Sequence, residues 1–179
     1  MIKYTTKTLE ELKVNAIGLV SSVTEDIDAY DFLSKYENTF NKTLIEYDNH
    51  YAYPIYILQH YQVDKSFSDY FLFLGDVVTY VPIQDEFHAT IFLITKYSGD
   101  SNIDYAALFK ALLKMEEYTK SSTVAFPYNL GSKEELDWRK VYLLIEAAFA
   151  DKEVIIFDAP KQLVKKQNSL WSRIKRLFS

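Results

Sequence analysis

The sequence predicts a single α/β domain, built as a three-layer α/β/α sandwich around a mixed central sheet. Two observations predict this class. Hydrophobic residues make up 49% and aromatic residues 16% of the 179 residues, which is enough for a full core. Helical and strand patterns alternate between residues 102 and 158, as expected for a sheet with helices on both faces.

The strands are predicted from short apolar runs that end at polar residues, glycine or proline. The run "NAIGLVSSV" at residues 15–23 has the length of one buried strand. Residues 69–83 predict two strand segments on either side of Gly75 and Asp76. The remaining strands are expected at residues 2–6, 88–95, 122–127 and 152–158.

The helices are predicted from apolar residues at helical spacing. One helix is expected at residues 24–40, where Thr24 or Asp26 can cap its start, and another at residues 136–149. Before the latter, Ser132 and Glu135 match the S-x-x-E pattern of a capping box, which indicates a helix that satisfies its own first N–H groups. The clearest helix spans residues 102–120, with an inner face of Tyr105, Leu108, Phe109, Leu112, Leu113 and Met115.

The charge distribution divides the chain into a domain at residues 1–158 and a basic tail at residues 159–179. The tail carries six basic residues and no acidic one from Lys161 onward. Subtracting these six from the chain's 20 basic residues leaves 14 against 25 acidic ones, a balance of −11. This acidic body opposes broad contact with nucleic acid, so a nucleic-acid partner is not expected.

The end of the tail forms an amphipathic pattern, with an apolar face opposite basic side chains. Such a helix suits an anionic membrane surface or an acidic groove on a partner protein. The alternative is a last helix that docks on the domain with its basic groups in water. The residues that carry this pattern are Leu170, Trp171, Arg173, Ile174, Lys175, Arg176 and Phe178.

Several kinds of chemistry are not expected from the composition. The chain has no cysteine, which removes disulfides and thiolate sites and fits a cytoplasmic protein. It begins without a signal-peptide pattern and has no apolar run long enough to span a bilayer. Its three histidines, His50, His60 and His88, lack the spacing of metal ligands. We therefore expect no metal, no cofactor and no catalytic residues.

The stretch from residue 124 to residue 158 resembles the C-terminal part of macro domains, which bind or hydrolyse derivatives of ADP-ribose. The motifs "VAFPYNLG", "DWRKVYLLIEAAF" and "VIIFD" carry the resemblance. The upstream segments "NAIGLVSSV", "ATIFLIT" and "DYAALFKALLKMEEY" are similar to the family in the same order, so that the resemblance covers residues 1–158. The matching positions in the C-terminal part are Ala125, Pro127, Tyr128, Leu130, Gly131, Asp137, Trp138, Val141, Ile145 and Phe149.

The chain departs from the family where the nucleotide would bind. The family's early Asp falls near Lys7 and Thr8, and its Asn after the second strand falls near Ser22. The two glycine-rich loops are replaced by residues 23–28 and 132–137, which contain carboxylates that repel phosphate. The resemblance leaves as ligand-binding candidates Ser22, Tyr128, Asn129, Leu130, Gly131 and Ser132.

Three functions are open at this point. The first expectation is a non-catalytic interaction or regulatory protein with an unidentified protein partner, in which the diphosphate-binding loops have been lost. The second is a binder or hydrolase of ADP-ribose or a related NAD-derived nucleotide, either an ADP-ribosyl hydrolase or an enzyme of ADP-ribose phosphate processing. The third is a peripheral membrane or adaptor protein recruited by the basic tail. The composition and the resemblance to phage-type sequences favour a bacterial cytoplasm, or a host cytoplasm for a phage protein.

Overall fold

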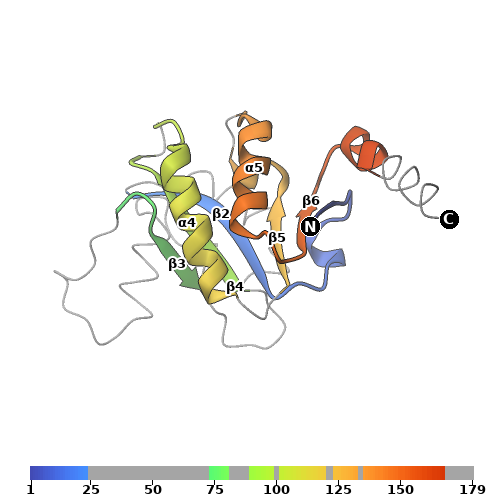
Figure 1. Cartoon of the computed structure of the whole chain (residues 1–179), viewed down its shortest axis with the longest axis horizontal. Coiled ribbons are helices and arrows are strands. Elements are labelled where there is room, and N and C mark those ends of the chain that lie inside the picture. Colours follow the sequence, from blue (N-terminus) through green and yellow to red (C-terminus); the bar gives the residue numbers. More distant parts are fainter. Residues whose placement is uncertain (24–72, 81–88, 99–100, 120–122, 133–134, 168–179) are drawn as a thin grey trace.

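The computed structural model describes residues 1–23, 73–80, 89–98, 101–119, 123–132 and 135–167. Its elements with described bounds are six strands, two α-helices and two 3-10 helices, and residues 161–167 are also α-helical (Figure 1). The strands are β1 (Ile2–Tyr4), β2 (Ala16–Ser22), β3 (Val77–Tyr80), β4 (Ala89–Lys96), β5 (Val124–Pro127) and β6 (Val154–Phe157). The helices are η1 (Leu9–Glu11), α4 (Tyr105–Tyr118), η3 (Tyr128–Gly131) and α5 (Trp138–Ala148).

The six strands form one mixed sheet in the order β1-β6-β5-β2-β4-β3. Neighbouring strands are parallel except β3, which pairs antiparallel with β4. Strand β2 lies inside the sheet, with β4 on one side and β5 on the other. The carboxyl ends of these three parallel strands therefore meet at one edge of the sheet.

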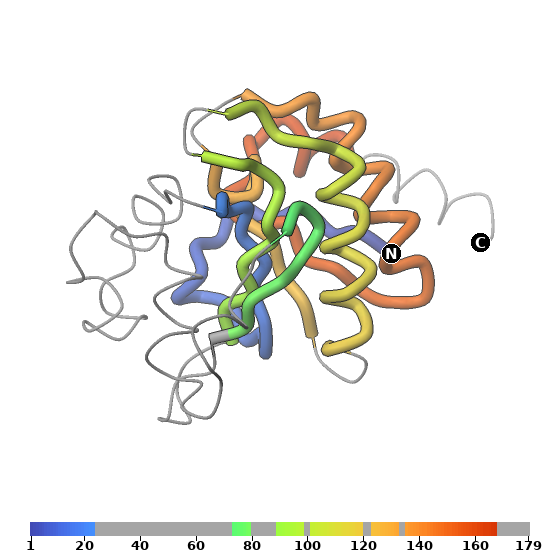
Figure 2. The backbone as a smooth tube through the Cα atoms, turned by 90° about the vertical axis from the view of Figure 1, so that its left-hand side faces the viewer, coloured from blue at the N-terminus to red at the C-terminus, as the bar shows by residue number. Residues whose placement is uncertain are grey.

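Both faces of the central strands are buried, as the predicted sandwich requires. Helices α4 and α5 lie next to each other along one face of the sheet (Figures 1 and 2). Ala16 and Val20 of β2 pack in the core on this side, whereas Ile17 and Leu19 alternate to the opposite face. All four are at most 2% exposed, so the opposite face is covered as well. This confirms an α/β sandwich with a mixed sheet, while the helix predicted at residues 24–40 lies outside the described residues.

Helix α4 is shorter than predicted because its start is fixed by a side chain. Asp104 accepts hydrogen bonds from the main-chain N–H groups of Ala106 at 2.8 Å and Ala107 at 3.0 Å. This N-cap begins the helix at Tyr105, three residues after the predicted start. The predicted inner face was wrong at Leu113, which is 43% exposed, because the buried stripe passes through alanines instead.

Two strand predictions also need correction. The first strand ends at Tyr4 and not at residue 6, although the N–H of Thr5 still donates to the carbonyl oxygen of Ile156. Residues 74 and 75 form a turn, in which Gly75 has a φ of 89° that favours glycine. The segment before β3 is therefore not a strand in residues 73–76, and residues 69–72 and 81–83 lie outside the description.

In the described part of the chain, no helix is both long enough and apolar enough to cross a membrane.

Helix α4 and strand β5 approach β2 closely at Gly18. A Cβ atom placed there would lie 2.3 Å from Cε1 of Phe126 and 2.9 Å from Sδ of Met115. Real Cβ atoms do not come this close to neighbouring atoms, so only glycine leaves the Phe126 ring its present position. This contact explains a glycine in the middle of a buried strand, a position where glycine otherwise weakens the sheet.

We therefore expect Gly18→Ala to lower the free energy of unfolding by about 1–3 kcal/mol, the usual cost of overpacking a core. Urea denaturation measures this loss. Phe126→Leu removes the ring atoms that clash, so the double variant Gly18→Ala/Phe126→Leu should be more stable than the two single losses predict together. Losses that simply add would show that the Phe126 ring does not restrict residue 18.

Candidate functional site

The carboxyl ends of β2, β4 and β5, together with η3, form what we call the candidate edge. Ligands of open α/β sheets bind outside the carboxyl ends of the strands, so a ligand of this domain is expected at this edge. Ser22 at the end of β2 is in register with Lys96 at the end of β4. The N–H of Val23 donates to the carbonyl oxygen of Lys96 at 3.0 Å. On the other side, η3 follows β5 directly and lies against β2.

The η3 turn has a left-handed backbone at three successive residues. The φ angles are 66° at Asn129, 54° at Leu130 and 79° at Gly131. This conformation raises the free energy of a residue with a Cβ atom by about 1–2 kcal/mol, and a bulky residue such as leucine adopts it rarely. The side chain of Leu130 is fully buried in the core beneath α4 and α5, which offsets the cost. Strained backbone of this kind is concentrated at functional sites in proteins.

The side chain of Asn129 holds the loop after η3 in place. Its Nδ2 donates to the carbonyl oxygen of Ser132 at 2.7 Å, and its Oδ1 accepts from the N–H of Leu136 at 3.1 Å. Leu136 is itself 7% exposed, so the loop is anchored at both ends. Asparagine suits this position because it tolerates the left-handed region and carries both a donor and an acceptor.

The predicted capping box at Ser132 and Glu135 is wrong. Ser132 ends η3, where its N–H donates to the carbonyl oxygen of Asn129 at 2.9 Å. Helix α5 starts only at Trp138, and its N-cap is Asp137, whose Oδ1 accepts from the N–H of Lys140 at 3.4 Å. The S-x-x-E pattern considers only residues 132–135, whereas Asn129, which lies before this stretch, bonds to Ser132 and to Leu136 after it.

The acidic loop is less free to repel a ligand than its sequence indicates. Besides capping α5, the Asp137 carboxylate lies 3.4 Å from Nζ of Lys140. Its main-chain N–H donates to the hydroxyl of Tyr105 at 3.0 Å. The negative charge of Asp137 is therefore partly balanced by the positive end of α5 and by Lys140. Glu135 is exposed.

An aromatic cluster, which we call the aromatic wall, joins η3 to the start of α5 and to β1. The rings of Tyr128 and Trp138 lie 4.6 Å apart between centroids. Trp138 Nε1 donates to the hydroxyl of Tyr4 at 3.1 Å, and the Tyr4 ring stacks on Tyr142 at 6.5 Å. Burial raises the pKa of the Tyr4 phenol above 10.0, while the Trp138 hydrogen bond partly opposes that rise. The phenol is therefore neutral at ordinary pH.

Lys96 is the residue of the candidate edge that sequence reasoning missed. Lys96 is only 3% exposed, a degree of burial that is unusual for lysine. The predicted strand ended at Thr95, and a lysine after a strand usually marks the point where the chain meets water. The signal that could have found Lys96 is its place directly after the apolar run "ATIFLIT", beside a central strand.

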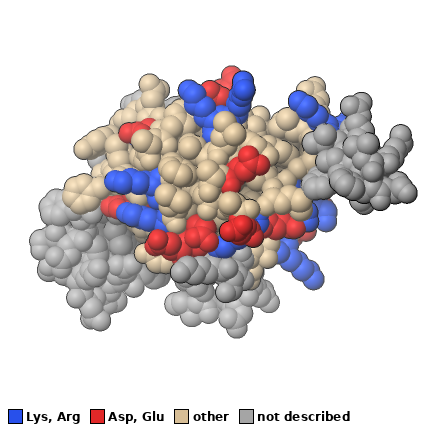
Figure 3. Space-filling model, viewed as in Figure 1, with Lys and Arg blue, Asp and Glu red and all other residues tan. Residues whose placement is uncertain are grey.

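The acidic side chains of the helix-covered face gather at the edge away from η3. Figure 3 shows them along the lower margin of this face, below α4 and α5. They include Glu116 and Glu117 at the end of α4 and Glu153 before β6, and two of them are paired. Lys152 Nζ lies 2.9 Å from Glu116, and Lys3 Nζ lies 2.5 Å from Glu153. Among the described residues, these carboxylates lie at the other end of the strands from the candidate edge.

The predicted ligand residues occupy the candidate edge but differ in exposure. Ser22 is 2% exposed and Leu130 is fully buried, so both side chains face protein. Tyr128, Asn129 and Gly131 are half-buried. A ligand-binding role for these residues stays a prediction, as does any role of the tail residues from Leu170 onward, which lie outside the description. Within the described ranges, no group of three or more His, Cys, Asp or Glu side chains could hold a metal ion.

Comparison with solved structures identifies this architecture. The macrodomain of Thermus aquaticus DarG matches with a TM-score of 0.58 and 15% sequence identity, over 89% of this chain and 99% of that chain. The macrodomain of Mycobacterium tuberculosis DarG matches with a TM-score of 0.58 and 19% identity, again over 89% and 99%. The chain has a macrodomain fold.

A further macrodomain-fold match comes from a structure described as Thermosipho africanus DarTG in complex with ADP-ribose. The TM-score is 0.54 and the identity 12%, over 83% of this chain and 39% of that longer chain. No protein-family model and no curated protein matches the sequence. The macrodomain fold of this chain therefore rests on its three-dimensional structure, which confirms the resemblance drawn from residues 124–158.

Because η3 depends on Asn129, its substitutions should separate backbone strain from hydrogen bonding. Asn129→Gly loses both side-chain hydrogen bonds but tolerates a positive φ, whereas Asn129→Ala loses the bonds and pays for the left-handed backbone as well. We expect the alanine variant to be less stable than the glycine variant by about 1 kcal/mol in chemical denaturation. The exposed Asn102→Ala serves as control. Equal stabilities of the two Asn129 variants would contradict a strained turn.

Proposed function

We propose that the chain binds an ADP-ribose-type nucleotide at the candidate edge. The observation that carries this proposal is the left-handed backbone of Asn129 and Leu130 at the same end of the strands as the buried residue Lys96. A strained turn and a buried charge are costly for a domain that needs only stability, and such features are kept where a ligand is bound. The macrodomain fold supports the choice of ligand, since a protein with this fold has been solved in complex with ADP-ribose.

The electrostatics of the candidate edge support a phosphate-bearing ligand despite the carboxylates in the loop. Asp137 is engaged by α5 and Lys140, and the acidic residues of α4 lie at the opposite edge. Lys96 supplies a positive charge in a site shielded from water, where its attraction for a phosphate is stronger than at an exposed surface. The lost glycines then alter how the diphosphate is held and do not abolish its binding.

Titration calorimetry with ADP-ribose tests this proposal. We expect micromolar binding, together with a rise in melting temperature at millimolar ligand. Lys96→Met keeps the length of the side chain without its charge and should weaken binding at least about tenfold, because a hydrogen bond to a charged group contributes about 1.5–3 kcal/mol.

The matched control is Lys13→Met, an exposed lysine at the other end of β2, which should bind like the unaltered chain. Neither heat nor a thermal shift at millimolar ADP-ribose would overturn the binding proposal. That result would favour the interaction or regulatory protein expected first from the sequence.

A second candidate function is hydrolysis of an ADP-ribosyl bond, and the buried position of Lys96 favours it. A lysine cation shielded from water stabilises negative charge that develops in the transition state. In the overall reaction water adds to the anomeric carbon of the ADP-ribosyl group, and the acceptor leaves with a proton. Whether the chain supplies this chemistry is separate from binding.

Release of ADP-ribose from a singly ADP-ribosylated peptide, followed by chromatography, tests the hydrolase candidate. We expect release by the unaltered chain and by Lys13→Met, and loss of release in Lys96→Met even at saturating substrate. Equal release by the two lysine variants would exclude a catalytic role for Lys96. No release by any of them would leave a binding protein.

The other expectations from the sequence stay predictions. These are a protein partner, recruitment to an anionic membrane, the domain boundary at residue 159 and a cytoplasmic location.

A further inference from the structure

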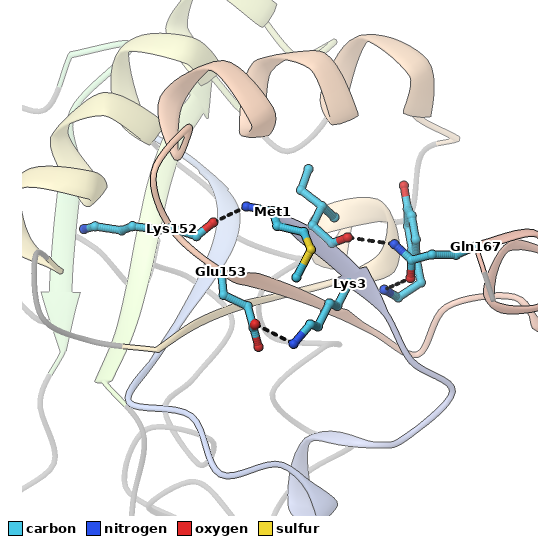
Figure 4. Close-up of polar contacts among 7 residues, drawn as sticks. Met1, Lys3, Lys152, Glu153 and Gln167 are labelled. Atoms are coloured by element: carbon cyan, nitrogen blue, oxygen red, sulfur yellow. Dashed lines mark hydrogen bonds and ion pairs between the residues drawn. The ribbon is translucent and has the colours of Figure 1, made fainter. Parts of the chain in front are cut away.

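Strand β1 is an outermost strand of the sheet. The side chain of Gln167 binds main-chain groups on its outer side. The inner side of β1 pairs with β6, as shown by the bonds from Val154 N–H to Met1 and from Thr5 N–H to Ile156. The outer side is met by Gln167, whose Oε1 accepts from the N–H of Tyr4 at 2.8 Å. Its Nε2 donates to the carbonyl oxygen of Ile2 at 2.7 Å (Figure 4). The carboxamide thus replaces one peptide group of a neighbouring strand.

Gln167 reaches β1 from helical residues 161–167, which lie beyond β6 at the β1 side of the sheet (Figure 1). Val164 is half-buried and packs on the core, whereas Lys161, Lys165 and Lys166 are exposed. Val164 and the two hydrogen bonds of Gln167 thus attach these helical residues to the domain. The Gln167 bonds connect them directly to β1.

Tyr4 links this contact to the candidate edge. Its main chain is bound by Gln167, and its hydroxyl accepts from Trp138 Nε1 at the start of α5. Trp138 in turn packs on Tyr128, the first residue of η3. A continuous set of contacts therefore runs from the C-terminal helix through β1 to the turn that borders the candidate edge. The raised pKa of Tyr4 keeps the phenol neutral throughout the physiological range, so its hydroxyl stays a stable acceptor.

We propose that Gln167 and Tyr4 are positioning residues that set the aromatic wall, and through Tyr128 the shape of η3. The docked helix fixes the main chain of Tyr4, Tyr4 fixes the indole of Trp138, and Trp138 fixes Tyr128. The effect on ligand affinity rests on the proposed nucleotide binding. The effect on the position of Trp138 and Tyr128 does not require a ligand.

The first experiment uses no ligand and compares Gln167→Ala with Gln162→Ala, an exposed glutamine of the same helix. Nuclear magnetic resonance follows the exchange of the Tyr4 amide and the chemical shift of the Trp138 indole N–H. We expect the Tyr4 amide to exchange about fivefold faster in Gln167→Ala, the effect of one lost hydrogen bond. The indole signal should also move. In Gln162→Ala both should stay as in the unaltered chain.

Tyr4→Phe provides the decisive comparison because it removes the hydroxyl that Trp138 binds and keeps the ring. The indole signal should move in Tyr4→Phe, and adding Gln167→Ala should then move it no further. A lower melting temperature of Gln167→Ala with an unchanged indole signal would show a merely structural role and would overturn the proposal. An additional shift of full size in the double variant would overturn the route through Tyr4.

Calorimetry with ADP-ribose extends the test to the ligand. Gln167→Ala should weaken binding about threefold to fivefold, and it should add nothing in the Tyr4→Phe background. Unchanged affinity in Gln167→Ala would overturn the influence on the ligand. If the unaltered chain does not bind ADP-ribose, the proposed function fails, while the indole signal still decides the positioning.

Discussion

The burial of β2 on both faces is the constraint from which the rest of the architecture follows. All seven residues of the strand are buried, so the helix layer must approach it on one side and a second covering on the other. The close approach leaves no room for a side chain at Gly18, where Phe126 and Met115 occupy the space. It also means that polar groups can enter the strand only near its end. Ser21 and Ser22 do so, next to Lys96 of the neighbouring strand. The candidate edge lies where the apolar run of β2 stops.

The η3 turn shows how strain and packing are balanced at that edge. Leu130 has an unfavourable φ, yet its side chain is fully buried, and burial of a leucine contributes about 1.5–3 kcal/mol. Asn129 adds two hydrogen bonds that hold the following loop. The core therefore stabilises a backbone that the turn alone would not adopt. A left-handed turn held in this way is rigid, which suits the recognition of a ligand better than a flexible glycine loop does.

Periodicity predicts the fold well and the candidate edge only in part, for physical reasons. The apolar runs of β2 and β4 and the helical spacing of α4 and α5 are local properties, and the structure confirms them. The burial of Lys96 depends on what surrounds the end of β4, so its place directly after an apolar run was the one local signal in the sequence. The S-x-x-E pattern at Ser132 failed because Ser132 ends η3 and α5 begins only after its own N-cap, Asp137. The exposure of Leu113 depends on which face of α4 meets the sheet. That face includes small alanines, which the prediction left out of the inner face.

In the described residues, the placement of the carboxylates weakens their repulsion of a phosphate at the candidate edge. A carboxylate repels phosphate only to the extent that it is free and near. Asp137 is committed to capping α5, and the acidic residues at the end of α4 lie at the far edge of the sheet. Lys96 provides a buried positive charge at the near edge. In the proposed binding, Lys96 and a rigid turn take the place that backbone N–H groups have in glycine-rich loops. A lysine is a point charge with rotatable donors, so this edge should rely more on charge and less on the geometry of a main-chain cradle.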